Sequence, residues 1–252
     1  MNLTKSASRR LRRLIFPAAS PVPAPSTLPT PPKTWETSQD YELRHAIAYM
    51  NTDEFRSVIS SDTEYGKLMV RQFFDRDELL WEEFKTAVAG KTGIDIGPCI
   101  WSPLASWDFL SRRIAIEPLG EKTKAFQREQ FGRSFFDNLE LLAHGADVFV
   151  PELDGKIDGI VYCRNMLDHT PKWPIVLANM SRYAAPGCML LLWTDYNHHG
   201  AADDGHYEIC EQEADLKRLV EQLGFEILRE HADVERFEAN WGCVAKKRDT
   251  PC

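Results

Sequence analysis

The sequence predicts an α/β protein built on a doubly wound, seven-stranded sheet with an antiparallel last strand, preceded by a helical N-terminal cap. From residue 92 onward, short β-rich runs alternate with helical stretches, the pattern of strands joined by crossovers. Only about ten residues separate the last two runs, too few for a crossover helix, so these runs should pair as an antiparallel hairpin at the sheet edge. A chain of 252 residues can form one such domain and an appendage.

Residues 1–34 are predicted to form a disordered, basic and proline-rich tail and linker. Six basic residues and no acidic residue fall within residues 1–35. Seven of the 15 prolines lie between Pro17 and Pro32, a composition that favours extended chain and cannot bury a core. The segment before Pro17 is also typical of an organelle transit peptide or of an anchor to an anionic surface, and both alternatives stay open.

Residues 35–88 carry aromatic and aliphatic side chains at helical spacing, among them Tyr41, Phe55, Trp81 and Phe84, and are predicted to form the helical cap. Residues 89–248 are then predicted to form the main domain. Its expected strands are residues 92–97, 113–117, 139–143, 157–163, 188–194, 226–231 and 241–246.

Charge and cysteine content narrow the class of function. The net charge is −8, and without the six positive charges of residues 1–35 the rest of the chain carries about −14. Such a body repels a phosphate backbone, so no nucleic acid is expected as a partner and a small molecule fits better. No apolar run is long enough for a transmembrane segment. The six cysteines form no CxxC pair and are interpreted as reduced core thiols, which favours a cytoplasmic protein.

Two carboxylates lie near the carboxyl ends of the first two predicted strands. The first strand leads into Asp95-Ile96-Gly97-Pro98, where glycine allows the backbone to come close to a ligand. The second strand ends in Glu117-Pro118, about twenty residues later, where folds of this kind hydrogen-bond a ribose diol. The alternative for Glu117 is a structural role, either at the start of the next helix or in an ion pair with Lys122 or Lys124.

With these motifs the chain resembles the class I S-adenosylmethionine-dependent methyltransferases, in particular the type 11-like members, whose fold is Rossmann-like. The resemblance implies S-adenosyl-L-methionine as cofactor, held by residues that include Asp95, Gly97, Pro98, Glu117 and Pro118. The family has two further glycines in the first loop, whereas Cys99, Ile100 and Trp101 stand in this region. This loop is therefore expected to have a different shape.

Later segments extend the resemblance to about residue 247. The turn His144-Gly145-Ala146-Asp147 is similar to the family's Gly-Asp-Ala turn, which implies that Ala146 or Asp147 contacts the adenine. The positions of Arg164 and Asn165, at the end of the fourth strand, line the methionine part of the cofactor in the family. Arg164 is also able to pair with a carboxylate. The Pro186-Gly187 turn before the fifth strand matches as well.

The catalytic candidates follow the fifth strand, because the acceptor must be aligned with the methyl group and a hydroxyl acceptor must lose a proton. His206, His198 and Asp195 are assigned this role, with His206 preferred as general base. A divalent metal held by side chains of residues 194–207 is the alternative, and a plain polar loop is the third interpretation, so no metal ligand is assigned. His169 follows the fourth strand, where members of the family often have a histidine that packs and hydrogen-bonds locally. The resemblance therefore favours a structural role for His169, and a catalytic role is the alternative.

These observations predict an S-adenosylmethionine-dependent methyltransferase for a small-molecule acceptor, such as a saccharide or a secondary-metabolite hydroxyl. One alternative is a non-catalytic protein with the same fold that serves as a binding module, suggested by the missing glycines. A nicotinamide-dependent enzyme is disfavoured, because the chain has no GxGxxG motif and ends in a hairpin.

Overall fold

The computed structural model describes residues 35–53, 55, 72–74, 77–197, 206–207, 209–210, 213–234 and 239–249. The predicted tail and linker of residues 1–34 and the catalytic candidate His198 lie outside the described residues.

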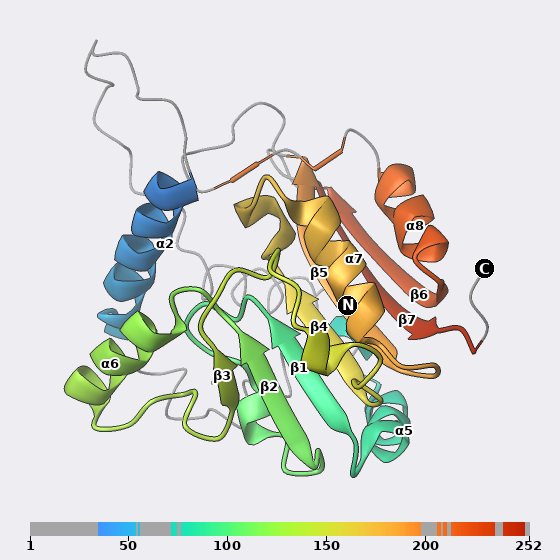
Figure 1. The fold of residues 1–252 in the computed structure, drawn as a ribbon, viewed down its shortest axis with the longest axis horizontal. Coiled ribbons are helices and arrows are strands. Elements are labelled where there is room, and N and C mark those ends of the chain that lie inside the picture. Colours follow the sequence, from blue (N-terminus) through green and yellow to red (C-terminus); the bar gives the residue numbers. More distant parts are fainter. Residues whose placement is uncertain are drawn as a thin grey trace, which may run out of the picture.

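The fold is a seven-stranded sheet with the strand order β3-β2-β1-β4-β5-β7-β6 (Figure 1). The strands are β1 (Thr92–Ile96), β2 (Arg112–Ile116), β3 (Glu140–Leu142), β4 (Ile160–Arg164), β5 (Met189–Asn197), β6 (Phe225–Val234) and β7 (Ala239–Lys247). The first five strands are parallel to one another, whereas β7 is antiparallel to both β5 and β6. The predicted Rossmann-like fold and its terminal hairpin are therefore confirmed.

The strands differ from the predicted ranges mainly at their ends. β4 begins at Ile160 and not at residue 157, because Ile157 forms only an isolated bridge with Ala184. β5 extends to Asn197, three residues beyond the prediction, because β7 pairs along its whole length. Consequently β7 lies between β5 and β6, and β6 occupies the sheet edge.

Helices cover both faces of the sheet. The α-helices are α2 (Trp35–Met50), α5 (Glu78–Val88), α6 (Gly120–Phe131), α7 (Trp173–Tyr183) and α8 (Glu213–Gln222). The 3₁₀ helices are η1 (Gln72–Phe74), η2 (Pro103–Ser106), η3 (Pro151–Leu153) and η4 (Leu167–His169). Among the described residues, no helix has the length and apolar character needed to cross a membrane.

Two apolar clusters form the core. In one, α7 and α8 bury side chains such as Met180 and Leu216 against the sheet, and Figure 1 shows both helices over the same face. In the other, α5 contributes Trp81, Phe84 and Val88, which lie three and four residues apart on one helix face. The side chain of Asp77 begins α5 by accepting hydrogen bonds from the N–H groups of its first turn.

The crossover between β1 and β2 contains the short η2 and no α-helix. The Ser102 hydroxyl accepts a hydrogen bond from the Leu104 N–H at the start of η2. Arg113, on β2, donates to the Ala105 carbonyl at 3.1 Å and to the Asp108 carboxylate at 3.2 Å. These contacts, in place of a helix, fix the segment that follows the first loop.

The N-terminal helix α2 lies beside α6, away from α5 (Figure 1). Its buried residues Ala46, Tyr49 and Met50 form a third apolar cluster with Phe55 and Phe135. Residues 99–101 of the first loop pack against this cluster. The helix α2 is therefore in direct contact with the loop that follows β1.

Candidate functional site

The carboxyl ends of β1 and β2 bring together Asp95, Gly97 and Glu117, three of the residues proposed from the sequence. The strands are parallel neighbours, and Asp95 pairs with Ala115, two residues before Glu117. Both carboxylates are buried, with 1% of Asp95 and 4% of Glu117 exposed. Because charged groups are rarely buried without compensating partners, such a pair marks a candidate ligand site.

Backbone N–H groups from two segments hold Glu117. One carboxylate oxygen accepts a hydrogen bond from the Cys99 N–H at 2.8 Å, and the other accepts one from the Leu119 N–H at 2.9 Å. Burial raises the pKa of Glu117 to about 7, although these two hydrogen bonds act in the opposite direction. The contact with Leu119, the residue that precedes α6, agrees with the structural alternative for Glu117. The contact with Cys99 ties Glu117 to the first loop.

Hydrogen bonds compensate only partly for the burial of the Asp95 carboxylate. Burial raises the pKa of Asp95 to about 8; a hydrogen bond with Ser102 opposes the shift and the neighbouring Glu117 carboxylate adds to it. The Oδ2 atom of Asp95 is buried and has no hydrogen-bond partner among the described residues. A buried acceptor without a hydrogen bond is energetically unfavourable. A ligand that donates a hydrogen bond to Asp95 Oδ2 would therefore stabilise the protein.

The first loop keeps a sharply turned backbone despite its missing glycines. Gly97 has a φ of +70°, and Cys99 has a φ of +57°, a left-handed conformation that is unfavourable for residues with a side chain. This turn directs the Cys99 N–H towards Glu117. Cys99 therefore adopts the conformation that glycine usually provides.

A buried glutamine on α6 fastens the same loop. Gln127 is fully buried, and its side-chain N–H donates to the Ile100 carbonyl at 2.6 Å. Its side-chain oxygen accepts hydrogen bonds from the Ser134 hydroxyl and the Phe135 N–H, both at 2.9 Å. Sequence analysis missed Gln127, because a polar residue within an exposed-looking helix gives no signal of burial.

Met166 lies directly over Gly97. A Cβ atom built on Gly97 would be 2.1 Å from Met166 Cγ, so any side chain at this position would collide with Met166. Met166 follows the two predicted cofactor residues at the end of β4. The Nε atom of Arg164 and the Oδ1 atom of Asn165 are buried there without hydrogen-bond partners in the described part of the chain. Because β4 pairs with β1, these residues share the edge occupied by Asp95.

The predicted adenine turn follows β3, at the same edge of the sheet. Ala146 is buried, and its carbonyl accepts a hydrogen bond from the Asn179 side chain at 2.9 Å. The Asp147 carboxylate accepts a hydrogen bond from Lys172 at 2.6 Å. Asp147 thus has a protein partner in this structure. The two predicted prolines, Pro98 and Pro118, are half-buried next to Gly97 and Glu117.

A second polar group lies beside this edge and includes two of the predicted catalytic residues. Asp195 is buried near the end of β5, and His206 lies in the segment before α8. The ring centroids of His206 and His169 are 4.5 Å apart. The Tyr207 N–H donates to the Asp168 carbonyl at 2.6 Å, which holds the His206 segment against η4.

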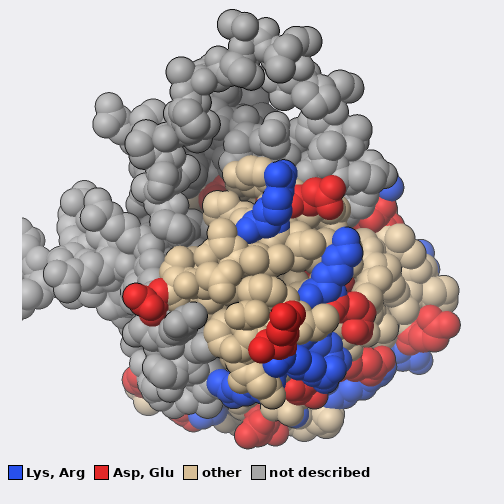
Figure 2. Space-filling model, turned by 90° about the vertical axis from the view of Figure 1, so that its left-hand side faces the viewer, with Lys and Arg blue, Asp and Glu red and all other residues tan. Residues whose placement is uncertain are grey.

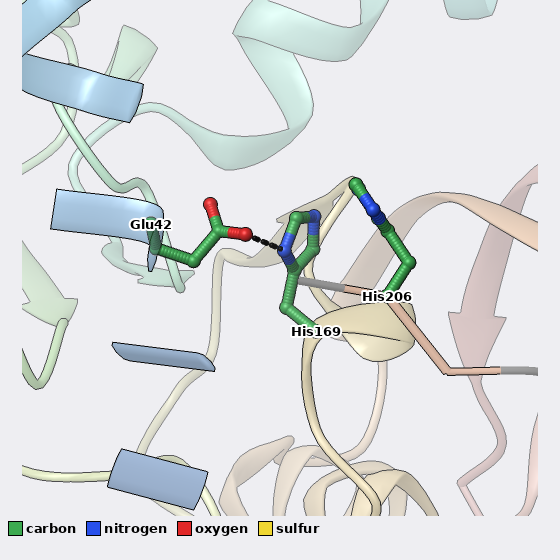
Figure 3. Close-up of side chains that lie close together, drawn as sticks. All are labelled: Glu42, His169 and His206. Atoms are coloured by element: carbon green, nitrogen blue, oxygen red, sulfur yellow. Dashed lines mark hydrogen bonds and ion pairs between the residues drawn. The ribbon is translucent and has the colours of Figure 1, made fainter. Parts of the chain in front are cut away.

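The His169 side chain is hydrogen-bonded to the N-terminal helix, whereas its backbone N–H donates locally, to the Met166 carbonyl at 3.0 Å. Its Nδ1 atom is 2.9 Å from the Glu42 carboxylate of α2, a residue 127 positions away (Figure 3). Burial by itself lowers the pKa of His169, but the carboxylates of Asp168 and Glu42, with a contribution from Asp195, raise it to about 10. Local hydrogen bonding of His169 is present through its backbone, but the side-chain contact with Glu42 was not predicted, because it depends on how α2 packs.

Comparisons with known proteins identify the fold. No family model matches the chain, and neither does any curated protein sequence. The solved structure of the [4+2]-cyclase SpnF superposes with a TM-score of 0.59 at 14% identity, over 90% of this chain and 100% of SpnF. The N-methyltransferase NodS from Bradyrhizobium japonicum, in complex with S-adenosyl-L-homocysteine, superposes with a TM-score of 0.55 at 12% identity. The match covers 84% of this chain and 98% of NodS.

A third structure comes from Galdieria sulphuraria and is assigned as a candidate sarcosine dimethylglycine methyltransferase. Its TM-score is 0.52 at 11% identity, over 69% of this chain and 83% of that one. At these identities the likeness concerns the fold. The protein therefore has the class I methyltransferase fold, with the candidate site at the carboxyl edge of its parallel strands.

Proposed function

We propose that the protein is an S-adenosylmethionine-dependent methyltransferase that acts on a small-molecule acceptor. The observation that carries this proposal is the buried pair Asp95 and Glu117, which faces the left-handed Gly97 at the carboxyl ends of β1 and β2. Ligands of open α/β sheets bind outside the carboxyl ends of the strands. The complex of NodS with S-adenosyl-L-homocysteine supports the choice of cofactor.

The donor groups of the cofactor fit the acceptors of the site. Among the described residues, Asp95 Oδ2 has no hydrogen-bond partner, and each oxygen of Glu117 accepts one backbone hydrogen bond and keeps a lone pair. Ribose hydroxyls and the amino-acid ammonium group are donors of the required kind. Pro98, Pro118, Ala146, Asp147, Arg164 and Asn165 complete the proposed binding set. When bound, the cofactor supplies an electrophilic methyl group on a sulfonium sulfur.

The residues proposed to handle the acceptor are His206, Asp195 and His198. A general base must be neutral at working pH, and the raised pKa of His169 keeps that imidazole protonated at neutral pH. His206 is therefore the better base for removing a proton from an acceptor hydroxyl, and the buried Asp195 carboxylate would orient the donor groups of the acceptor.

The charge pattern of the surface beside α2 favours a small-molecule acceptor over a nucleic acid. In Figure 2, which turns the left-hand side of Figure 1 towards the viewer, basic and acidic side chains alternate on the described surface and form no continuous basic area. Binding to a nucleic-acid backbone depends on such an area. The free thiols, of which those of Cys163, Cys188 and Cys243 are buried, support a reducing compartment, and we propose the cytoplasm.

Calorimetric titration with S-adenosyl-L-homocysteine tests the proposed function. Glu117→Gln presents an N–H group to a backbone N–H, so it should weaken binding at least tenfold, or by about 1.5–3 kcal/mol for each charge-assisted hydrogen bond lost. Glu121→Gln, an exposed substitution in the first turn of α6, is the matched control and should bind as the unmodified protein does. Equal affinities for both variants would refute the proposal.

A non-catalytic role with the same fold is the second candidate. One observation favours it: the left-handed Cys99 stands in the first loop in place of glycine. Binding of S-adenosylmethionine without methyl transfer to any member of an acceptor library would support this candidate. Transfer to one acceptor would exclude it.

A further inference from the structure

Three side chains from distant parts of the chain meet beside the proposed cofactor site. Glu42 comes from α2, His169 from η4, and His206 from the segment before α8 (Figure 3). One potential ligand atom from each lies within 4.8 Å of the other two. The Glu42 and His169 side chains are only 18% and 19% exposed, so the group is sheltered from solvent.

The composition and charge of this group suit a transition-metal ion. Two imidazoles and one carboxylate form a ligand set found in zinc and non-haem iron sites, with positions left open for water or substrate. The buried Asp168 carboxylate lies 3.8 Å from His169, which adds negative charge at short range. A divalent cation that binds His169 must displace the proton of that imidazole, and the Glu42 and Asp168 carboxylates would then balance the charge of the cation.

The arrangement is held in place by contacts that do not involve a metal. The hydrogen bond from the Tyr207 N–H to the Asp168 carbonyl fixes the His206 segment against η4. The packing of Met50 and Tyr49 against the first loop fixes α2. Because zinc–ligand bonds are about 2.0–2.2 Å long, small rotations of the three side chains are enough to place them around one ion.

We propose that Glu42, His169 and His206 bind one divalent transition-metal ion, with Zn²⁺ as the reference ion. The site is separate from the residues 194–207 alternative, since it shares only His206 with that loop and takes a ligand from the N-terminal helix. The charges of Glu42 and His169 act on Glu117, so a bound ion would lie near the proposed cofactor site and could hold an acceptor hydroxyl or carboxylate there. With a metal bound, His206 acts as a ligand and not as a base.

Calorimetric titration of the full-length, chelator-treated protein with ZnCl₂ tests the site. We expect one ion per chain, with at least tenfold weaker binding for Glu42→Gln and for His206→Asn. Asp40→Asn, an exposed substitution on α2, and His231→Asn, on β6, are the matched controls and should bind as the unmodified protein does. MgCl₂ should give no comparable binding, because imidazole ligands favour softer ions.

Cobalt(II) gives an independent readout, since its visible absorption bands report the ligand set. The bands should appear with the unmodified protein and with both controls, and should be lost or shifted in Glu42→Gln and His206→Asn. Circular dichroism checks that each variant folds. If only one of the two ligand variants folds, its titration alone tests the site. Absence of saturable one-to-one binding, or unchanged binding in a folded ligand variant, would overturn the proposal, whether or not S-adenosylmethionine binds.

Discussion

At the residue scale, Gly97 is the position where backbone conformation and packing both require glycine. Gly97→Ala should lower the free energy of unfolding by about 3 kcal/mol or more, from left-handed strain and from the collision with Met166. Gly132→Ala is the control, because Gly132 has a φ of +69° but open space around it, and should cost about 1–2 kcal/mol. Urea denaturation measures both; equal losses would show that Met166 does not constrain Gly97.

The buried carboxylates predict a pH dependence of stability. Because the pKa of Asp95 is raised to about 8 in the folded protein, its contribution is fully present below the unfolded-state pKa of about 4 and is lost as the pH rises through 8. Compared with Asp95→Asn, the unmodified protein without ligand should therefore lose up to about 1.4 kcal/mol of stability for each pH unit between pH 5 and 8. Parallel pH profiles for the two proteins would contradict the assignment.

At the element scale, the first loop is held to α6 by Gln127. Gln127→Ala leaves the Ile100 carbonyl and the Phe135 N–H without their buried partner and should lower the free energy of unfolding by about 3 kcal/mol. Gln130→Ala, on the exposed side of α6, should change it by less than about 0.5 kcal/mol. Thermal or chemical denaturation distinguishes the two, and similar small effects would show that the loop is held by other contacts.

The sequence predicted the strands of the sheet better than it predicted the side-chain contacts between packed segments. Strands β1, β2 and β5 could be predicted, because buried parallel strands are continuous apolar runs with clear ends. The positions of Asp95 and Glu117 could be predicted for the same reason, since Asp95 lies near the end of β1 and Glu117 directly follows β2. Gln127 and Glu42 could not, because their partners are set by the packing of α6 and α2, and hydrophobic periodicity carries no information on which polar residue faces a neighbouring segment.

At the scale of the whole molecule, α2 joins the N-terminal region to the site through Glu42 and His169. Glu42→Gln weakens a charge-assisted hydrogen bond and should increase the rate of amide hydrogen exchange in α2, whereas Asp40→Asn should leave it unchanged. Hydrogen exchange followed by mass spectrometry provides the measurement. Equal exchange in both variants would show that apolar packing alone holds the helix.

The central claim is that the carboxyl edge formed by β1, β2 and β4 binds S-adenosylmethionine. A crystal structure of the protein soaked with S-adenosyl-L-homocysteine tests it most directly. The ligand should lie over Gly97, with its ribose hydroxyls at hydrogen-bond distance from Glu117 and a donor group on Asp95 Oδ2, and Met166 should move to admit it. A ligand bound elsewhere, or an edge left without ligand at saturating concentration, would contradict the claim.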